Sequence, residues 1–314
     1  MKKMTFNLTD EQKEKYKWAI SRGYFKNYSL AWRTTSFDGV WLWKYPKRVG
    51  QYELFMSIVG HTPDWSDITD RNLRIYVETL SETLCPNSVK TLCAELKAII
   101  NERIDEEDIP SKRYAKILTI AKEDSEAVYL SNKELQRIRE YEPKSDIEKA
   151  VRDVFMIEAL TGARHCDSER LTMTNVNTET KTIHYTSQKT RKSVDEPFHS
   201  WLVDYLPKDA DELAKRPKLG QYSFNRALRR ICKNVGITKT MTIYRRGCEE
   251  TAPKWQFVAS HTARRSYATN LMLWGAELGL ISSFMGHSSV QMTSHYIKDT
   301  PNIPAKVLQF FNKD

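Results

Sequence analysis

Two segments near the C-terminus, SHTARRSYATNL (residues 260–271) and FMGHSSVQMTSHYIK (residues 284–298), carry side chains suited to handling a phosphate. His261 and Arg264 stand three residues apart, so a helix over the first segment projects both from one face. In the second segment, Tyr296 lies nine residues beyond His287. The two segments therefore predict a largely helical region that gathers two histidines, an arginine and a tyrosine at one site.

Two further segments lie upstream, LTGARHCDSERL (residues 160–171) and SQKTRKSV (residues 187–194). The first follows a predicted helix over residues 147–161 and contains Arg164 and, three residues later, Asp167. The second forms the centre of KTIHYTSQKTRKSVDEPF (residues 181–198), whose short alternating stretches predict a β-hairpin. This hairpin carries Lys189 and Lys192 near its tip.

The order and wording of these four segments resemble the catalytic domain of the tyrosine recombinases, the integrase family of phages and mobile elements. The resemblance covers residues 127–300 and rests on T-G-x-R, the K-T dipeptide, H-x-x-R and G-H-S-S followed by a tyrosine. Each motif alone is weak, whereas all four in this order are specific. The residues that the resemblance identifies as catalytic are Arg164, Lys189, His261, Arg264, His287 and Tyr296, with Asp167 in a supporting position.

The chemistry implied by the resemblance explains the need for two arginines. Attack on a DNA phosphodiester places extra negative charge on the non-bridging oxygens of a five-coordinate phosphorus. Arg164 and Arg264 can hold these oxygens bidentately and stay charged at any working pH. Removing one such preorganised donor costs about 3–4 kcal/mol of transition-state stabilisation. We expect His287 to donate to the same phosphate, from the turn that enters the helix carrying Tyr296.

The tyrosine and the leaving group also need proton transfer. A tyrosine hydroxyl, with an ordinary pKa of about 10, is a poor nucleophile at neutral pH. We expect His261 to act as the base for Tyr296 and Lys189 to protonate the departing 5′-oxygen. The product is a 3′-phosphotyrosyl linkage that preserves the bond energy. Neither ATP nor a metal is then required, and we expect no cofactor.

Several of these residues have structural alternatives. Arg164 could be a surface arginine with Asp167 as its ion-pair partner, and Tyr296 alone would be a core tyrosine. Lys192 competes with Lys189, which the K-T dipeptide favours. We interpret Asp167 as orienting its neighbours. The residues beside the catalytic set are interpreted as a structural or DNA-backbone contact for Arg265, an outward-facing neighbour for His165 and an incidental one for His295.

The chain length of 314 residues predicts two domains. Residues 47–124 show helical periodicity and resemble, more weakly, the family's core-binding DNA-binding domain, with Thr69 and Ser88 as expected N-caps. Ser131 and Glu134 form a capping box just after a boundary near residues 122–128. Residues 127–314 form the catalytic domain, which reads as helical beyond residue 201 except for a loop over residues 241–256. The predicted fold class is therefore mainly α with a small antiparallel β-sheet.

Residues 1–46 are basic and rich in aromatic side chains, and the family resemblance does not extend to them. They contain four of the eight tryptophans. These rings could stack on bases or form a small aromatic core. We hypothesise that deleting residues 1–46 weakens DNA binding and flattens its salt dependence.

The net charge of +9 points weakly toward an acidic polymer, and its distribution is more informative. The net charge is +7 over residues 1–50, −6 over residues 51–126 and +8 over residues 127–314. A helix over residues 223–236 would align four cations in one stripe, which is either a DNA contact or a solvated face. The predicted DNA-binding residues are Lys192, Arg226, Arg229, Arg230, Lys233 and Arg265.

Other classes of protein are disfavoured. The sequence has no phosphate-binding glycine loop, no G-x-G-x-x-G, no H-E-x-x-H and no G-x-S-x-G. Five cysteines without a C-x-x-C pair fit a reducing compartment and predict no metal site. No apolar run approaches the roughly 18 residues of a membrane span, and residues 1–15 lack the apolar core of a signal peptide. We therefore expect a cytoplasmic protein that does not contact membranes.

The resemblance implies a site-specific DNA recombinase that acts on double-stranded DNA for integration or excision of a mobile element. Four protomers would exchange strands on two duplexes, with accessory DNA-bending proteins as possible partners. The apolar tail, residues 300–314, would pack on its own domain or on a neighbouring protomer. Two alternatives are a type IB topoisomerase-like relaxase and a non-catalytic DNA-binding regulator with the same fold.

Overall fold

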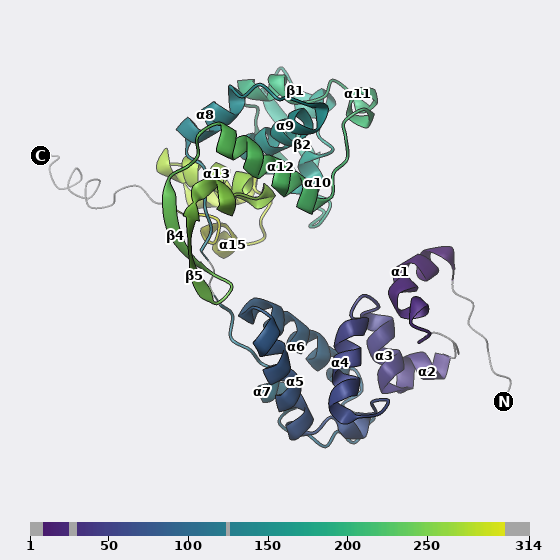
Figure 1. The fold of residues 1–314 in the computed structure, drawn as a ribbon. Coiled ribbons are helices and arrows are strands. Elements are labelled where there is room, and N and C mark those ends of the chain that lie inside the picture. The colour runs from purple at the N-terminus through teal and green to yellow at the C-terminus, as the bar shows by residue number, and fades with distance from the viewer. Residues whose placement is uncertain (1–8, 25–29, 124–125, 299–314) are drawn as a thin grey trace, which may run out of the picture. The chain divides into compact units, whose positions relative to one another are not determined.

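A computed structural model of the chain describes residues 9–24, 30–123 and 126–298 (Figure 1). The chain divides into two compact units. The first comprises Met1–Ser125 together with Arg246–Cys248, and the second comprises Glu126–Arg245 together with Glu249–Asp314. The apolar tail over residues 300–314, for which we left two packing modes open, lies outside the described residues.

The described part of the first unit is helical. Its elements are α1 (Asp10–Ser21), α2 (Leu30–Thr35), α3 (Phe37–Lys44), α4 (Val49–Val59), the 3₁₀ turn η1 (Trp65–Asp67), α5 (Asp70–Thr83), α6 (Pro86–Asn101) and α7 (Tyr114–Ile117). α3 packs on α4 and α6, and α5 packs on α4, α6 and α7. Residues from 1–46 and from 47–124 thus build one unit.

The core of the first unit is aromatic. Phe37 and Trp41 on α3 are buried and lie edge to face, with ring centroids 5.5 Å apart. Trp41 also meets Tyr52 and Tyr76 edge-on, at 5.8 and 6.4 Å. Edge-to-face contacts of this kind add to the gain from burying the rings. Of the two alternatives for the N-terminal aromatic residues, the aromatic core is the one that Phe37 and Trp41 form.

Two expected helix starts in this unit differ in outcome. Thr69 caps α5, its hydroxyl accepting from the Asn72 amide, as predicted. Ser88 does not cap α6, because the helix begins two residues earlier at Pro86. Proline is well suited to the first helical position, since it has no N–H to satisfy there and its φ is already helical.

The second unit is mainly helical with short antiparallel strands, which confirms the predicted fold class. Its first half comprises α8 (Asn132–Arg139), α9 (Asp146–Thr161), α10 (His165–Ser168), η2 (Met173–Asn175), β1 (Val176–Asn177), β2 (Thr182–Thr186), β3 (Ser193–Pro197) and η3 (Ser200–Asp204). Its second half comprises α11 (Ala210–Ala214), α12 (Gln221–Asn234), β4 (Thr240–Arg245), β5 (Cys248–Pro253), η4 (Lys254–Phe257), α13 (Ser260–Leu273), α14 (Leu278–Phe284) and α15 (Val290–Ser294).

Helix α9 is the central element of the second unit. It packs against α8, α12, α13 and η3, and it is buried around most of its circumference. Ser145 caps its start by accepting from the Glu148 amide. It ends at Gly162, whose φ of 61° is left-handed. This sharp end turns the chain directly into the segment that holds Arg164.

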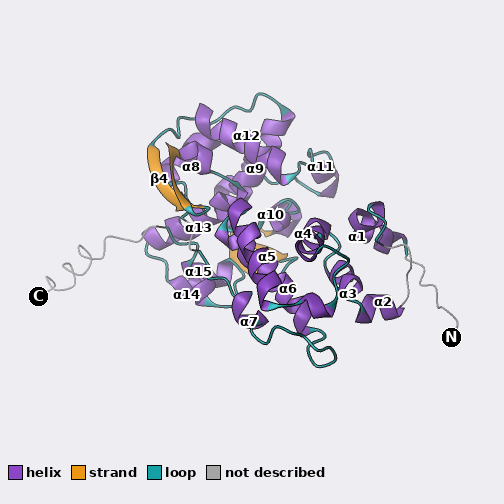
Figure 2. Ribbon diagram, turned by 60° about the horizontal axis from the view of Figure 1, so that its bottom comes forward, coloured by secondary structure: helices purple, strands orange, loops and turns teal. Residues whose placement is uncertain are grey.

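The predicted hairpin over residues 181–198 is present as β2 and β3, with β1 paired on the other edge of β2. The expected loop over residues 241–256 is wrong, because it forms a second hairpin, β4–β5 (Figure 2). Arg246 and Gly247 both have positive φ, 55° and 82°, as a two-residue hairpin turn of the mirror-image type requires. Arginine is not a usual residue for the first of these positions, which is why the hairpin turn was not recognised from the sequence.

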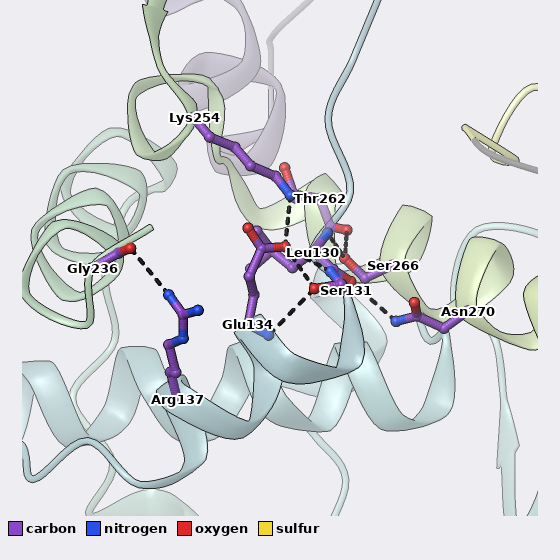
Figure 3. Close-up of polar contacts among 9 residues, drawn as sticks. All are labelled: Leu130, Ser131, Glu134, Arg137, Gly236, Lys254, Thr262, Ser266 and Asn270. Atoms are coloured by element: carbon purple, nitrogen blue, oxygen red, sulfur yellow. Dashed lines mark hydrogen bonds and ion pairs between the residues drawn. The ribbon is translucent and has the colours of Figure 1, made fainter. Parts of the chain in front are cut away.

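Polar contacts join the start of α8 to the helix that carries the site (Figure 3). The predicted capping box of Ser131 and Glu134 is present. The Leu130 amide donates to Ser266 Oγ at 2.8 Å, and Asn270 Nδ2 donates to the Leu130 carbonyl at 3.0 Å. Since Ser266 and Asn270 share one face of α13, these bonds fix the rotation of the helix about its axis.

Candidate active site

Helix α13 places Arg264 in the interior of the second unit. Its side chain is 1% exposed, although arginine is rarely buried to this degree. Nη1 donates to the Gly162 carbonyl, and Nη2 donates to the Met285 carbonyl at 2.6 Å. The carbonyls come from the end of α9 and the end of α14, so Arg264 joins three helices. Burial, followed by the charge of Arg164, lowers the pKa of Arg264.

His287 lies directly against Arg264. Its Nε2 is 2.7 Å from Arg264 Nη2, and its Nδ1 is 2.8 Å from Thr293 Oγ1. An arginine can only donate, so Nε2 accepts and the ring proton sits on Nδ1. Burial and the charges of Arg264, Arg164 and Lys192 lower the pKa of His287 to about 4. In this arrangement His287 does not donate from Nε2, contrary to the expectation that it donates to phosphate.

The ring of Tyr296 lies among these groups. Its centroid is 5.1 Å from that of His287 and 6.0 Å from that of His261, and the guanidinium carbon of Arg264 lies 5.4 Å from the ring. The helix expected to carry Tyr296 ends at Ser294, so the tyrosine lies just beyond it. Thr269 Oγ1 donates to the Tyr296 carbonyl at 3.3 Å and holds the segment on α13.

His261 stands at the start of α13, one turn before Arg264, as predicted. Although solvent reaches its ring, loss of water from the packed side and the nearby charges of Arg265, Arg264 and Arg164 lower its pKa to about 4. The imidazole is therefore neutral at pH 7. A neutral imidazole beside the ring of Tyr296 can accept a proton, as a base must.

Arg164 is positioned by a hydrogen-bonded chain. Its Nη1 donates to Ser187 Oγ at 2.9 Å, and that hydroxyl donates to Asp167 Oδ2 at 2.9 Å. Asp167 is 1% exposed and also accepts from the Gln188 amide at 2.8 Å. Asp167 therefore joins α10 to the β2–β3 hairpin and acts on Arg164 through Ser187, not as its direct ion-pair partner.

The two candidate lysines differ in position. Lys189 is exposed in the turn between β2 and β3, with no hydrogen bond or ion pair to another described residue. Lys192 Nζ donates to the His287 carbonyl at 3.1 Å, and its charge acts on that ring. The structure therefore brings Lys192, and not Lys189, to the group around Arg264.

Two neighbours of the predicted residues take a larger part than expected. His165 does not face outward: its Nδ1 bonds to Glu158 Oε1, and its Nε2 lies 3.6 Å from Glu169. Burial raises the pKa of Glu158, which is 1% exposed, to about 7. Arg265 is half-buried, and a charge on Tyr296 would act on it, so it can help to stabilise a phenolate. The sequence did not reveal the contact with Glu158, because Glu158 lies in α9 and His165 in α10, and the turn at Gly162 separates the two helices.

The predicted basic stripe on α12 is only partly available. Arg230 pairs with the buried Glu148 at 2.8 Å, and Arg229 Nε donates to the Val258 carbonyl at 3.0 Å. Lys233 lies over the ring of Trp255, 5.5 Å from its centroid. Arg226 is exposed with no such partner among the described residues. Packing against α9 and η4 therefore uses cations that the sequence pattern assigned to DNA.

The described residues give no candidate for a bound metal ion. No group of three or more histidine, cysteine, aspartate or glutamate side chains is arranged among them to hold a metal. In the same residues, every helix is too short or too polar to span a membrane. A cavity of about 740 Å³ in the second unit lies between α9, α10, α11 and α12, beside Arg170 and Gln188.

Comparison with known proteins assigns the family. Residues 128–302, more than half of the chain, match the model described as the phage integrase family. The chain belongs to the phage integrase family. The matched range contains Arg164, Lys189, His261, Arg264 and Tyr296.

Two tyrosine recombinases and a phage integrase are similar to this chain in sequence. A tyrosine recombinase XerC from Natranaerobius thermophilus is 22% identical over 277 residues, which cover 86% of this chain and 90% of that protein. The integrase of Haemophilus phage HP1 is 27% identical over 150 residues, covering 48% of this chain and 37% of its own length. A tyrosine recombinase XerD from Corynebacterium glutamicum is 26% identical over 162 residues, which cover 49% of this chain and 51% of that protein.

Solved integrase-family structures share the fold at low sequence identity. XerH bound to a difH substrate in a post-cleavage complex has a TM-score of 0.59 at 17% identity, covering 98% of this chain and 86% of that one. The Tn1549 transposon integrase bound to transposon right-end DNA has a TM-score of 0.60 at 13% identity, covering 88% of this chain and 98% of that one. A lambda integrase dimer bound to a core site has a TM-score of 0.56 at 17% identity, covering 83% and 95%.

Proposed function

We propose that this integrase-family protein is a site-specific DNA recombinase in which Tyr296 forms a 3′-phosphotyrosyl linkage with the cleaved strand. The observation that carries the proposal is the grouping of His261, Arg264 and His287 around the ring of Tyr296. These groups come from α13, the turn between α14 and α15 and the segment after α15. A core tyrosine would not need two imidazoles and a buried guanidinium around it.

Each group has a role that its surroundings permit. Neutral His261 accepts the phenol proton, and Arg264 with Arg265 favours the phenolate. Arg164, oriented through Ser187, holds a non-bridging oxygen. Arg264 retains a donor for a second oxygen, because its Nε–H has no hydrogen-bond partner among the described residues. Exchange of the contact with His287 Nε2 would free a further donor on Nη2 and leave the two carbonyl bonds of Arg264 intact.

The departing 5′-oxygen needs a proton, which a lysine of the β2–β3 hairpin supplies. Lys189 stays our candidate, because its exposed turn can reach a strand bound over the site. Lys192 then holds the His287 loop through the His287 carbonyl. Displacement of one phosphate ester by another conserves the bond energy, so the scheme needs no nucleotide.

The partner is double-stranded DNA. The similar solved structures include complexes with DNA, among them a post-cleavage complex of XerH and a lambda integrase dimer on a core site. We extend this to an assembly of four protomers on two duplexes that moves a mobile element, acting in the cytoplasm where the DNA is accessible. The first unit then acts as the core-binding domain and the second as the catalytic domain.

A nicked suicide duplex tests the proposal. The site is first selected from a randomised pool by binding, and the duplex is then incubated with the protein in EDTA without nucleotide. Because the nick lets the short downstream fragment diffuse away, cleavage should accumulate a covalent adduct. The adduct should retain a label placed at the 5′ end of the cleaved strand. The released downstream fragment should carry a free 5′-hydroxyl. If the protein binds the site and no adduct forms, it is a non-catalytic regulator.

Strand exchange separates a recombinase from a relaxase. A recombinase needs two sites in one assembly, so joint molecules between two labelled duplexes should rise steeply with protein concentration. Relaxation of a single supercoiled circle at a rate proportional to protein concentration, without joint molecules, would instead assign a type IB topoisomerase-like activity.

A further inference from the structure

Strand β3 contains a carboxyl group in an unusual setting. Glu196 is 1% exposed, and its Oε2 accepts from the Tyr267 hydroxyl at 3.0 Å. Its Oε1 is buried without a hydrogen-bond partner in the described part of the chain. No lysine, arginine or histidine of that part forms an ion pair with it. By contrast, Asp195 next to it is exposed and pairs with His184 on the other face of the sheet.

This setting disfavours the charged form of Glu196. An unpaired carboxylate in the interior loses its hydration and gains no cation in return, so it takes up a proton instead. Burial raises the pKa of Glu196 well above its usual range, and the charge of Arg264 offsets only part of this. The titratable groups facing it are Arg264 and Tyr267 on α13 and Tyr185 on β2. α14, which also packs on β3, has no titratable residue.

Tyr267 connects Glu196 to the contacts of Arg264. A Cβ on Gly162 would lie 2.4 Å from Tyr267 Cδ1, so the ring packs directly on the glycine backbone. The carbonyl of that glycine accepts from Arg264 Nη1. A shift of the Tyr267 ring would therefore move the Gly162 carbonyl and, with it, the guanidinium that it holds.

We propose that Glu196 is a positioning residue for DNA cleavage: as a neutral carboxyl it anchors Tyr267, and so fixes the Gly162 carbonyl against Arg264, without placing a negative charge beside that guanidinium. The inference rests on the proposed function and extends it to a residue that does not touch the DNA. A carboxylate at this position would pair electrostatically with Arg264 and weaken its attraction for the phosphate. A neutral carboxyl leaves the whole charge of Arg264 for the substrate.

Three substitutions separate the roles of shape, hydrogen bond and charge. Glu196→Gln keeps the shape and the neutral state, and should cleave within about twofold of the wild-type rate at pH 7. Glu196→Ala and Tyr267→Phe break the tether, and should lower the rate at least fivefold. Asp195→Asn, the matched control on the same strand, should leave the rate unchanged. The rates are single-turnover rates of adduct formation by the full chain at saturating protein, with thermal unfolding measured in parallel.

A pH profile adds a readout that a purely structural role would not change. The rates are measured from pH 6 to 10, and only the wild type has a group at position 196 that can ionise as pH rises. The ratio of the Glu196→Gln rate to the wild-type rate should therefore stay near one while Glu196 is protonated and rise once it loses its proton. Ionisable groups common to both proteins cancel in this ratio.

Clear results would overturn the proposal. A Glu196→Gln rate tenfold or more below wild type at pH 7, with unchanged unfolding temperature, would mean that the charge is required. Wild-type rates for Glu196→Ala or Tyr267→Phe would mean that the tether has no role in cleavage. If Glu196→Gln does not fold, Tyr267→Phe decides the proposal alone. Failure of wild type to form any adduct would count against the proposed function and not against this inference.

Discussion

At the scale of single residues, Arg264 shows how the chain prepares a charge before substrate arrives. Its guanidinium is held by the backbone carbonyls of Gly162 and Met285, groups that no side-chain substitution removes. One carbonyl belongs to Gly162 and the other, of Met285, directly precedes Gly286. Neither glycine has room for a Cβ, which would meet Tyr267 at Gly162 and Val194 at Gly286. The backbone at these two points therefore sets the position of the arginine.

Gly162→Ala tests this arrangement. The added Cβ would collide with the Tyr267 ring, and φ of 61° is itself strained for alanine. We expect a loss of about 2–4 kcal/mol of stability and a fall in cleavage larger than the fraction unfolded explains. Gly236→Ala is the control, because its φ is 77° but the nearest atom lies 3.9 Å away. Chemical denaturation and single-turnover cleavage measure both, and equal losses for the two variants would contradict the account.

His287 should make stability depend on pH. Its pKa is about 4 in the folded chain and about 6.5 when unfolded. Between these values the unfolded chain binds a proton that the folded chain does not, so stability falls as pH drops from about 6.5 to 4. The contribution of His287 to the free energy of unfolding is on the order of 3 kcal/mol, and it is fully present above pH 6.5. Urea denaturation at pH 7 and 4.5 measures the free energy of unfolding at each pH. Its decrease between the two should be smaller for His287→Gln than for the wild type, and an identical decrease would contradict the assignment.

At the scale of elements, the sequence predicted what depends on periodicity and local caps. Helix α9, the β2–β3 hairpin and the capping box at Ser131 follow from local patterns that tertiary packing reinforces. The β4–β5 hairpin was missed because Arg246 occupies a turn position usually held by asparagine or aspartate. The sequence pattern assigned too many residues of α12 to DNA binding. Helical periodicity shows on which face of the helix a cation lies, but not which residue it pairs with, such as Glu148 for Arg230.

The same limit applies to the site. The motifs identified the groups that converge on Tyr296, because their spacing depends on one helix and two turns. They did not identify Glu158 or Glu196, which are buried acids that only the fold places behind Arg264. They favoured Lys189 over Lys192 through the K-T dipeptide alone, although a shift of register in a hairpin tip changes which lysine points inward.

The hairpin lysines can be separated by the chemistry of the leaving group. Lys189→Ala should slow cleavage of a normal phosphodiester by about 10²–10⁴-fold, the range typical of general acid catalysis. A 5′-bridging phosphorothiolate leaves as a thiolate without a proton and should restore most of that rate. Lys192→Ala should slow both substrates alike, because it loosens the His287 loop. Selective rescue of Lys192→Ala would exchange the two roles.

At the scale of the whole molecule, the N-terminal segment belongs to the fold of the first unit. Phe37 and Trp41 lie in the same core as Tyr52 and Tyr76, so a deletion of residues 1–46 would unfold the unit. Weaker DNA binding after such a deletion would therefore not reveal a DNA contact. The −6 net charge of residues 51–126 stays consistent with contact along one face only.

Trp41→Ala tests the place of this segment in the core. Trp41 is 2% exposed and meets aromatic rings from α3, α4 and α5, so truncation should cost about 3–5 kcal/mol of the stability of the first unit. Trp18→Ala is the control, because that ring is 59% exposed and should cost less than about 0.5 kcal/mol. Equal denaturation midpoints for the two variants would contradict the aromatic core.

The most direct test of the central claim is to locate the covalent bond. Wild-type protein is trapped on the nicked suicide duplex in EDTA, the adduct is digested with nuclease and protease, and the modified peptide is sequenced by mass spectrometry. The account predicts a nucleotide joined through its 3′-phosphate to Tyr296, and no adduct with Tyr296→Phe under conditions where that variant still binds the duplex. An adduct on another residue, or an undiminished adduct with Tyr296→Phe, would contradict it.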